Sequence, residues 1–283
     1  MRALLTRLEQ AAVLDRAGDR LQRGVLAVLR PQRVRDVLHG VWLGHPLHPA
    51  LVQLPVGAWV SAAILDLLPG QRRAATALVG VGTAAALPAA LSGLNDWASL
   101  AREQRRVGMV HAIANGVGVL LYGGSLAARL AGLHAVGRTL GFAGLSAVSG
   151  GAFLGGHLAY KQASAVNHGI PELRQLSDGW YAVADLAALP ERTLHTRRID
   201  EVSVLVYRNG DQVSVLLDRC AHQGGPLGEG ELVTVRGRDC VVCPWHGSTF
   251  QLGDGRVVHG PAANDQQVLP TRVVGGVLQT RLP

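Results

Sequence analysis

The stretch from Cys220-Ala-His222 to Cys243-Pro-Trp-His246-Gly decides the fold of the C-terminal part of the chain. It holds two Cys/His pairs with 20 residues between them, and glycines follow each pair. Thiolates stabilise ferric iron, while neutral imidazoles remove negative charge from a second iron and raise its potential. The pattern therefore predicts a [2Fe-2S] centre whose ligands are Cys220, His222, Cys243 and His246.

The same stretch, extended to Gln-Gly-Gly-Pro-Leu227 after the first pair and to Gly-Ser-Thr-Phe250 after the second, resembles the Rieske family. The resemblance covers roughly Asp178 to Pro283. It implies that the two cysteines bind a buried iron and that the two histidines bind an outer iron near the surface. Gly260-Pro261 resembles the proline loop that shields the cluster in this family.

Two departures from the best-known Rieske subclass are informative. The Rieske proteins of quinol-oxidising bc complexes carry a disulfide between the two cluster loops, whereas Gly225 and Trp245 stand at the corresponding positions here. Those proteins also place a tyrosine hydroxyl near a cluster cysteine where this chain has Phe250, although Ser248 is retained. The resemblance is therefore to the ferredoxin type of Rieske domain. Because fewer hydrogen bonds to sulfur lower the reduction potential, we expect a potential below that of the bc class.

A structural zinc site is the main alternative for these residues. It would use Cys220, Cys240, Cys243 and a histidine, since Cys240 and Cys243 form a Cys-x-x-Cys pair. A zinc site would more often begin with another Cys-x-x-Cys pair. Cys240 is better interpreted as an apolar strand residue, because free cysteine packs as a small hydrophobic side chain. With two of the three cysteines assigned to iron, no disulfide framework remains, which indicates a reducing compartment.

The composition points to a membrane protein. The 283 residues are 48% hydrophobic and only 17% charged. Four apolar segments, at residues 50–68, 74–94, 108–128 and 139–160, approach or exceed the roughly 20 helical residues that cross a bilayer. Small residues such as those of Gly151-Ala-Phe-Leu-Gly155 favour close helix contact. A four-helix transmembrane bundle is therefore predicted.

Basic residues indicate how the bundle is oriented. The face with the N-terminus, the loop at 95–107 and the linker after the fourth segment carries Arg30, Arg33, Arg35, Arg102, Arg105, Arg106, Lys161 and Arg174. The opposite face carries Arg72, Arg73, Arg129 and Arg138. Because cytoplasmic loops hold an excess of basic residues, both termini and the C-terminal domain are predicted on the cytoplasmic side of a bacterial inner membrane.

The predicted organisation has four parts. Residues 1–44 form a basic amphipathic segment, 45–160 the membrane domain, 161–177 a short linker and 178–283 the Rieske domain. The first segment either lies on an anionic membrane surface or packs on the rest of the protein, and its interrupting charges argue against a secretory signal. The net charge of +7 does not indicate nucleic acid, because the arginines are spread and aromatic residues make up only 4%.

Four histidines, His45, His48, His111 and His157, fall on the predicted cytoplasmic side of the bundle. The His45-Pro-Leu-His48-Pro motif resembles an uncharacterised bacterial membrane-domain family, over about residues 44–160, and that family supplies no established activity. Histidines on facing helices could ligate a b-type haem, or they could form a quinone or proton-transfer pocket. They could equally cap helices and form hydrogen bonds within the bundle, and the sequence leaves these alternatives open.

Beyond residue 177 the hydrophobic period becomes alternating. Residues 202–207 and 212–217 flank Arg208-Asn-Gly-Asp211, which predicts a hairpin with Asn-Gly in a type I′ turn. Gly237 and Gly275-Gly276 mark further turns. The predicted fold class is a multi-domain membrane protein, with an N-terminal four-helix transmembrane bundle and a C-terminal all-β antiparallel domain.

The expected function is one-electron transfer, because a Rieske cluster carries one electron and its imidazole ligands can couple it to a proton. The donor or acceptor would be a redox partner protein, the quinone pool or a bundle cofactor. The alternatives are a redox sensor or scaffold, and the electron-input subunit of an oxygenase or reductase complex. No GxGxxG, P-loop or Ser/His/Asp set is found, so no catalytic residue is assigned and enzyme activity is left open.

Overall fold

The computed structural model describes residues 2–173 and 177–281, and it divides the chain into two compact units. The first unit combines Met1–Arg30 with Leu47–Ser164, and the second combines Pro31–Pro46 with Ala165–Pro283. The predicted basic segment at 1–44 is thus shared between the two units. Arg174, which entered the count of basic residues, lies outside the described residues.

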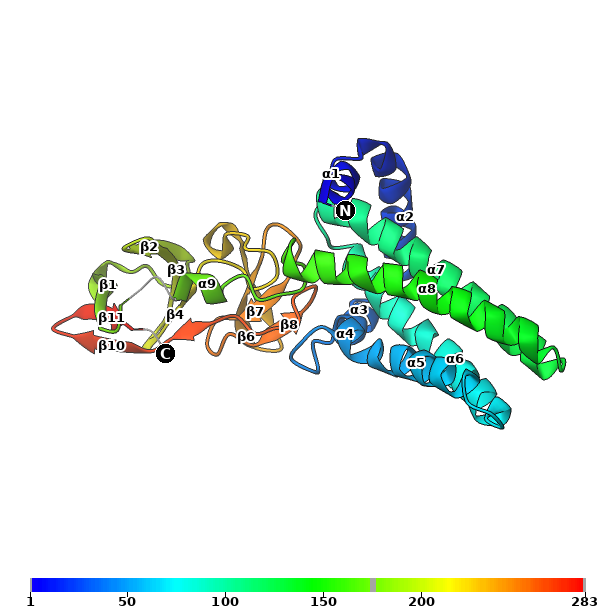
Figure 1. Cartoon of the computed structure of the whole chain (residues 1–283). Coiled ribbons are helices and arrows are strands. Elements are labelled where there is room, and N and C mark those ends of the chain that lie inside the picture. The colour runs from blue at the N-terminus through cyan, green and yellow to red at the C-terminus, as the bar shows by residue number, and fades with distance from the viewer. Residues whose placement is uncertain (1, 174–176, 282–283) are drawn as a thin grey trace. The chain divides into compact units, whose positions relative to one another are not determined.

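The first unit is helical (Figure 1). It begins with α1 (Arg2–Glu9), a 3₁₀ turn at Ala12–Leu14 and α2 (Asp15–Val28). The helices that follow are α4 (Leu47–Leu51), α5 (Gln53–Asp66), α6 (Arg72–Trp97), α7 (Arg102–Leu130) and α8 (His134–Tyr160). Four helical stretches, the first of them α4 together with α5, are long and apolar enough to cross a membrane. The four predicted spans are therefore confirmed. The last three helices are longer than the predicted apolar segments, because polar residues at their ends are also helical.

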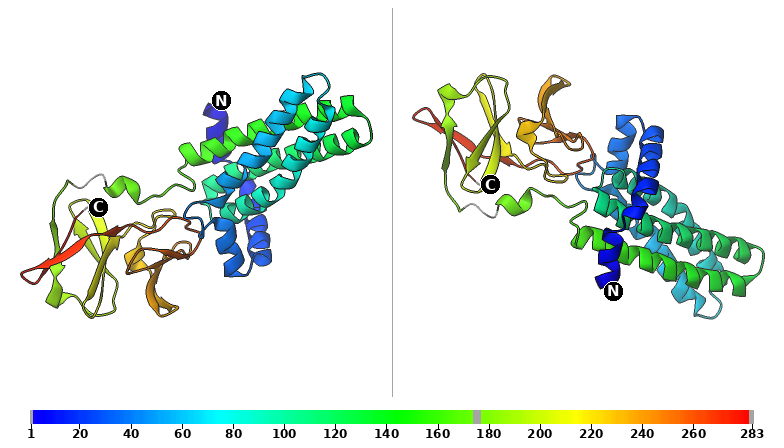
Figure 2. Two further views of the ribbon diagram at one scale, coloured as in Figure 1. Left: turned by 90° about the horizontal axis from the view of Figure 1, so that it is seen from below. Right: turned by 90° about the horizontal axis from the view of Figure 1, so that it is seen from above.

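The long helices pack in a ring. α5 lies along α6 and α7 along α8, while contacts of α6 with α7 and of α5 with α8 close the bundle (Figure 2). At the centre, Trp59 stacks on Tyr122 with ring centroids 4.2 Å apart. Glycines make room for these rings, because a Cβ on Gly82 would lie 2.6 Å from the Trp59 indole and one on Gly144 would lie 3.0 Å from Tyr122. This is the close packing that the small residues predict.

The N-terminal helices are fastened to the bundle by charged pairs. α1 and α2 pack on α7. Both carboxylate oxygens of Asp15 accept hydrogen bonds from Arg106 at 2.7 Å, and Glu9 lies 2.8 Å from the His157 ring and 3.1 Å from the Lys161 amine. The hydrogen bond with His157 is the main cause that lowers the pKa of Glu9. In the structure, α1 and α2 are thus packed on the rest of their unit.

The second unit is built on three antiparallel sheets, which confirms the predicted β domain. The first contains β1 (Tyr181–Asp185), β11 (Val277–Thr280) and β10 (Thr271–Val274). The second contains β2 (His195–Ile199), β3 (Val202–Asn209), β4 (Gln212–Leu217) and β9 (Val268–Leu269). The third contains β5 (Glu231–Val235), β6 (Arg238–Val242), β7 (Thr249–Gln251) and β8 (Val257–His259). Two short helices, α3 (Gln32–His39) and α9 (Ile170–Leu173), complete the unit.

The predicted hairpin between β3 and β4 is confirmed, but the predicted turn type is wrong. Asn209 pairs with Gln212, so the loop is Gly210-Asp211, and of these two residues only Gly210 has a positive φ, of 60°. One positive φ at the first central position is typical of a type II′ turn. Asn209 ends the strand instead of entering the turn, and its side-chain amide donates to Asp239 at 2.9 Å.

Candidate metal centre

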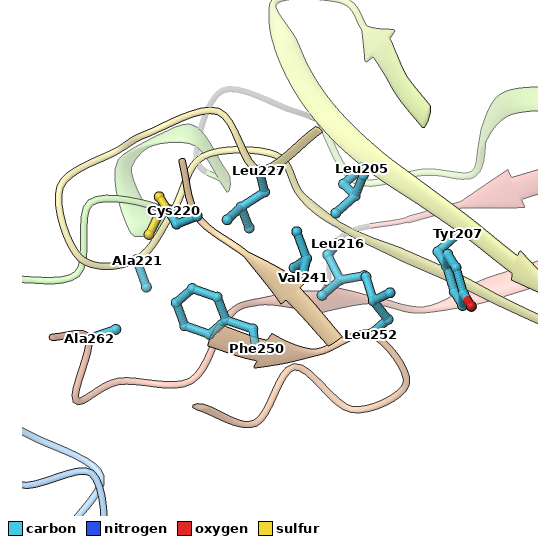
Figure 3. Packing of buried hydrophobic residues seen from close by; sticks show 11 residues of the cluster. Leu205, Tyr207, Leu216, Cys220, Ala221, Leu227, Val241, Phe250, Leu252 and Ala262 are labelled. Atoms are coloured by element: carbon cyan, nitrogen blue, oxygen red, sulfur yellow. The ribbon is translucent and has the colours of Figure 1, made fainter. Parts of the chain in front are cut away.

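The two sheets that contain β3 and β6 deliver the Cys/His loops to one end of the second unit. The apolar core between these sheets includes Leu216, Val241 and Phe250, and it continues to the cysteines (Figure 3). The chain leaves β4 towards Cys220 and leaves β6 towards Cys243. Both cysteines are buried, with 1% and 3% of their surfaces exposed. The two thiols therefore meet at the edge of a dry core.

The backbone of the two loops follows the same pattern. In each loop, the carbonyl of the cysteine accepts a hydrogen bond from the glycine four residues later, from Gly224 at 2.8 Å and from Gly247 at 3.0 Å. These glycines have φ values of 73° and 78°, in the left-handed region where a Cβ is unfavourable. The glycines noted in the sequence are thus needed to turn both loops back on their cysteines.

Backbone amides point at both sulfur atoms. The donors are His222 and Gln223 for Cys220, and Trp245 and His246 for Cys243. The two thiols also share a hydrogen bond, which raises the pKa of Cys220 and lowers that of Cys243 to about 6. Two adjacent sulfurs, each facing amide donors that stabilise a thiolate, suit the two sulfur ligands of one iron.

The two imidazoles lie side by side near the surface. The ring centroids of His222 and His246 are 5.1 Å apart. Burial lowers the pKa of His222 to about 3, with a smaller contribution from His246, and burial also lowers the pKa of His246. Both rings are therefore neutral at physiological pH, which is the form that binds metals. Within the described residues, the buried Nδ1 atom of His222 has no hydrogen-bond partner, and a metal would satisfy it.

The loops approach each other closely at Gly225. A Cβ there would lie 3.0 Å from the Cys243 sulfur and 2.9 Å from Trp245. The positions that the resemblance equates with the disulfide of the bc class therefore lie against each other, although neither is a cysteine. The two loops can approach each other this closely because Gly225 has no side chain.

The segment after Gly260 covers the same core. The backbone amide of Ala262 donates to the Ser248 hydroxyl at 2.9 Å, and Ala262 packs in the cluster that contains Cys220. Phe250 is fully buried in that cluster and carries no hydroxyl. The four-ligand site is thus closed by apolar groups on its cysteine side, which excludes water from the thiols.

Cys240 does not join the other cysteines. It lies in β6, where it is fully buried and its thiol lies 3.5 Å from the Arg238 carbonyl. Over residues 2–173 and 177–281, no group of three or more His, Cys, Asp or Glu side chains could hold a single metal ion. This argues against the zinc alternative, whereas a [2Fe-2S] cluster needs only two side chains on each iron.

Comparisons with known proteins agree with this geometry. A family model described as "Rieske [2Fe-2S] domain" matches residues 179–271. This part of the chain is a Rieske domain. A second model, described as "Predicted membrane protein (DUF2231)", matches residues 44–168. The chain is therefore a fusion of a predicted membrane domain with a Rieske domain, as the two resemblances implied.

Individual relatives match the chain in part. A Rieske domain-containing protein of Homo sapiens is 34% identical over 88 residues, 30% of this chain and 53% of that protein, so the match spans about half its length. The anthranilate 1,2-dioxygenase ferredoxin subunit of Burkholderia cepacia is 24% identical over 103 residues, 36% of this chain and 92% of that subunit. A solved structure, the ferredoxin of carbazole 1,9a-dioxygenase from Nocardioides aromaticivorans IC177, is 23% identical, covers 37% of this chain and 98% of its own, and has a TM-score of 0.34.

The histidines proposed for a second cofactor do not form one group. The Nδ1 atoms of His48 and His111 lie 2.8 and 2.7 Å from backbone carbonyls of α6 and α8, and their ring centroids are 6.3 Å apart. His157 is hydrogen-bonded to Glu9 instead, and His45 belongs to the second unit. The comparisons give no support to a haem or a quinone at these residues.

Sequence reasoning missed two residues of α3. Asp36 is hydrogen-bonded to His259 and to the Gly260 amide, and His39 is 1% exposed beside Gly260. The only available signal was that Asp36 is the sole acidic residue between positions 19 and 66.

Proposed function

We propose that this chain is a membrane-anchored Rieske electron-transfer protein in which Cys220 and Cys243 bind one iron and His222 and His246 bind the other. One observation carries the proposal: two loops of equivalent backbone geometry bring two thiols and two neutral imidazoles to one end of the β unit. When bound, such a cluster exchanges one electron at a time.

The residues of the chain have separate roles in this proposal. Backbone amides at the two sulfurs stabilise negative charge, and the apolar core around Leu227 and Phe250 keeps water from the cysteines. The two histidines are partly exposed, whereas the cysteines are buried. Electrons therefore enter and leave on the imidazole side.

The membrane domain anchors this centre, and the excess of basic residues supports a cytoplasmic position for both termini and the Rieske domain. The partner is a redox protein or the quinone pool. A partner protein is favoured because the Burkholderia cepacia relative is a ferredoxin subunit of a dioxygenase. Protease treatment of inside-out and right-side-out membrane vesicles tests the orientation, since the Rieske domain should be cleaved only in the inside-out vesicles.

The decisive test of the proposal is spectroscopic. The full chain, purified in detergent, should contain iron and acid-labile sulfide and should give a Rieske-type EPR signal after reduction with dithionite. Stoichiometric zinc without iron would overturn the assignment of the four ligands. Additional haem absorption bands that disappear in His48→Ala or His111→Ala would assign a second cofactor to the bundle.

The carrier role needs a kinetic test of its own. A carrier must be re-reduced on the millisecond scale by reduced ferredoxin or by a quinol. If every such donor reduces the protein only slowly, the carrier proposal fails and the cluster is better interpreted as a redox sensor.

A further inference from the structure

Helix α3 has two faces with different surroundings. Its inner face carries Gln32, Asp36 and His39, which fall on one side because they are spaced by whole helical turns. The Asp36 carboxylate accepts a hydrogen bond from the Gly260 amide at 2.9 Å and lies 2.9 Å from Nδ1 of His259, and His39 is buried. The inner face therefore binds α3 to the β unit beside β8.

The outer face of α3 is apolar and exposed. Val34 and Val37 lie one turn apart on the side turned away from Asp36 and His39, and 44% and 55% of their surfaces are exposed. Trp42 follows the helix, and its indole N–H donates to the Val37 carbonyl at 3.2 Å, yet 65% of its surface is exposed. Three large apolar side chains are thus exposed within one short segment.

The exposed charge beside this face is positive. Arg33 is exposed next to Val34, whereas Asp36, the sole acidic residue between positions 19 and 66, lies on the inner face. An apolar face flanked by arginine is typical of helices that lie in the interface of an anionic membrane. Tryptophan is also enriched at that interface, because the indole has an apolar body and one polar group. The composition of the outer face therefore fits a lipid surface.

The covalent chain keeps this segment close to a bilayer. The first stretch that could cross a membrane begins at Leu47, five residues after Trp42. Because each residue extends the backbone by at most about 3.6 Å, the Cα atom of Trp42 lies within about 18 Å of the start of that stretch. A lipid surface is therefore within reach of the outer face of α3.

We propose that the outer face of α3, formed by Val34, Val37 and Trp42 with Arg33 beside it, lies on the surface of an anionic membrane and holds the β unit there. The acyl region of the lipid would accept the three apolar side chains, and the anionic headgroups would attract the arginine. This inference goes beyond the proposed electron transfer, and it does not depend on a bound cluster.

Spin labelling of the full chain tests this contact in nanodiscs made from phosphatidylcholine and phosphatidylglycerol. Collisions of a nitroxide with oxygen report the acyl region, and collisions with a water-soluble nickel chelate report water. The ratio of oxygen to nickel collisions should be several-fold higher for a label at Val37→Cys than at Val273→Cys. Val273 is the matched control, because it is a valine of similar exposure (48%) in a sheet that does not contain β8. The three native cysteines are buried, so the introduced cysteine should take the label.

Two results would overturn the proposal. A label at position 37 with the same collision ratio as the label at position 273 would place the outer face of α3 in water. A label at position 37 that is protected from both reagents would mean that protein covers this face, such as a second copy of the chain. The labels are read without dithionite reduction, so a failure to find the iron–sulfur cluster would leave this test intact.

The role of the positive charge is tested in the same nanodiscs. Arg33→Glu places a negative charge against anionic headgroups, so nickel collisions of the label at position 37 should rise several-fold. Arg236→Glu makes the same change of charge in the exposed turn between β5 and β6, and this matched control should leave the label unchanged. Equal collision rates in Arg33→Glu and in the chain with Arg33 would overturn the attraction to anionic lipid.

Discussion

The two ligand loops share a backbone pattern but not their surroundings. Each cysteine carbonyl accepts from a left-handed glycine four residues later, and each sulfur faces two backbone amides. The backbone of the His222 loop is bound by His168, whose amide donates to the Ala221 carbonyl, whereas the His246 loop leaves Trp245 exposed. Local sequence therefore determines how each loop arranges its candidate ligands, whereas the surroundings of the two loops depend on other parts of the chain.

The loops also depend on different sheets. The first follows β4 and the second follows β6, so the distance between their ligands is set by how the two sheets are joined. The shared core of Leu205, Leu216, Val241 and Leu252 joins them near the middle, and Asp239 links them beyond it.

The largest effect should come from the cysteines. Cys220→Ser or Cys243→Ser removes one of the two thiolates proposed for a single iron, so either variant should lose the cluster completely, because both loops are needed at that iron. Iron and sulfide analysis together with EPR measures the loss. Cys240→Ala is the control and should retain the cluster, since Cys240 lies within β6. Loss of the metal in Cys240→Ala as well as in the other two variants would return the zinc alternative, which uses all three cysteines.

The histidines should distinguish the covered loop from the open one. His222→Ala and His246→Ala each remove an imidazole, and both should lose the Rieske EPR signal. Millimolar imidazole added during cluster reconstitution should restore the signal in His246→Ala, whose neighbours Trp245 and Gly247 are exposed, but not in His222→Ala, whose loop has Ala221 and Gly225 buried. Equal rescue of the two variants would mean that the two loops are equally open.

Sequence patterns predicted what depends on local chemistry. The spacing of Cys220, His222, Cys243 and His246 located the candidate centre, and the length of the apolar segments located the four spans, because each signal is contained in a short window. The hairpin at β3 and β4 was predicted for the same reason. Its turn was not, because the side chain of Asn209 is held by Asp239 from another sheet.

The attachment of α3 to β8 could not be predicted from such windows. Asp36 and His259 are 223 positions apart, and nothing near either residue indicates the other. Residues 1–44 carry one basic amphipathic pattern throughout, yet α2 packs on the membrane helices while α3 packs on the β unit. Amphipathic periodicity shows that a face is buried but does not show which surface buries it.

A smaller effect is expected at the junction of the two sheets. Asp239 accepts hydrogen bonds from Tyr207 at 2.6 Å, Asn209 at 2.9 Å and Thr234 at 3.1 Å. Asp239→Asn should lower the free energy of unfolding by about 1–3 kcal/mol, because a charge-assisted acceptor is lost. Thermal unfolding followed by near-UV circular dichroism measures this change.

The pH dependence of that effect has a definite sign. The hydrogen bond from Tyr207 is the main cause that lowers the pKa of Asp239 below its ordinary 3.8. A lowered folded-state pKa stabilises the protein above the ordinary value, and this stabilisation is lost as the pH falls through the lowered pKa. The difference between the wild type and Asp239→Asn should therefore shrink below about pH 4. A difference that stays constant down to pH 3 would contradict the role of the carboxylate.

The smallest effect should be a shift in potential at Phe250, which packs fully buried in the core that contains both cysteines. Phe250→Tyr places a hydroxyl where the bc class has one near a cluster sulfur. A hydrogen bond to sulfur stabilises the reduced, more negative cluster, so the potential should rise by about 40–60 mV, which corresponds to about 1–1.4 kcal/mol for one electron. Phe250→Leu adds no hydroxyl and should not raise the potential, so equal shifts in the two variants would attribute the change to packing. Redox titration followed by EPR measures both, and a lower potential in Phe250→Tyr would show that the hydroxyl does not reach sulfur.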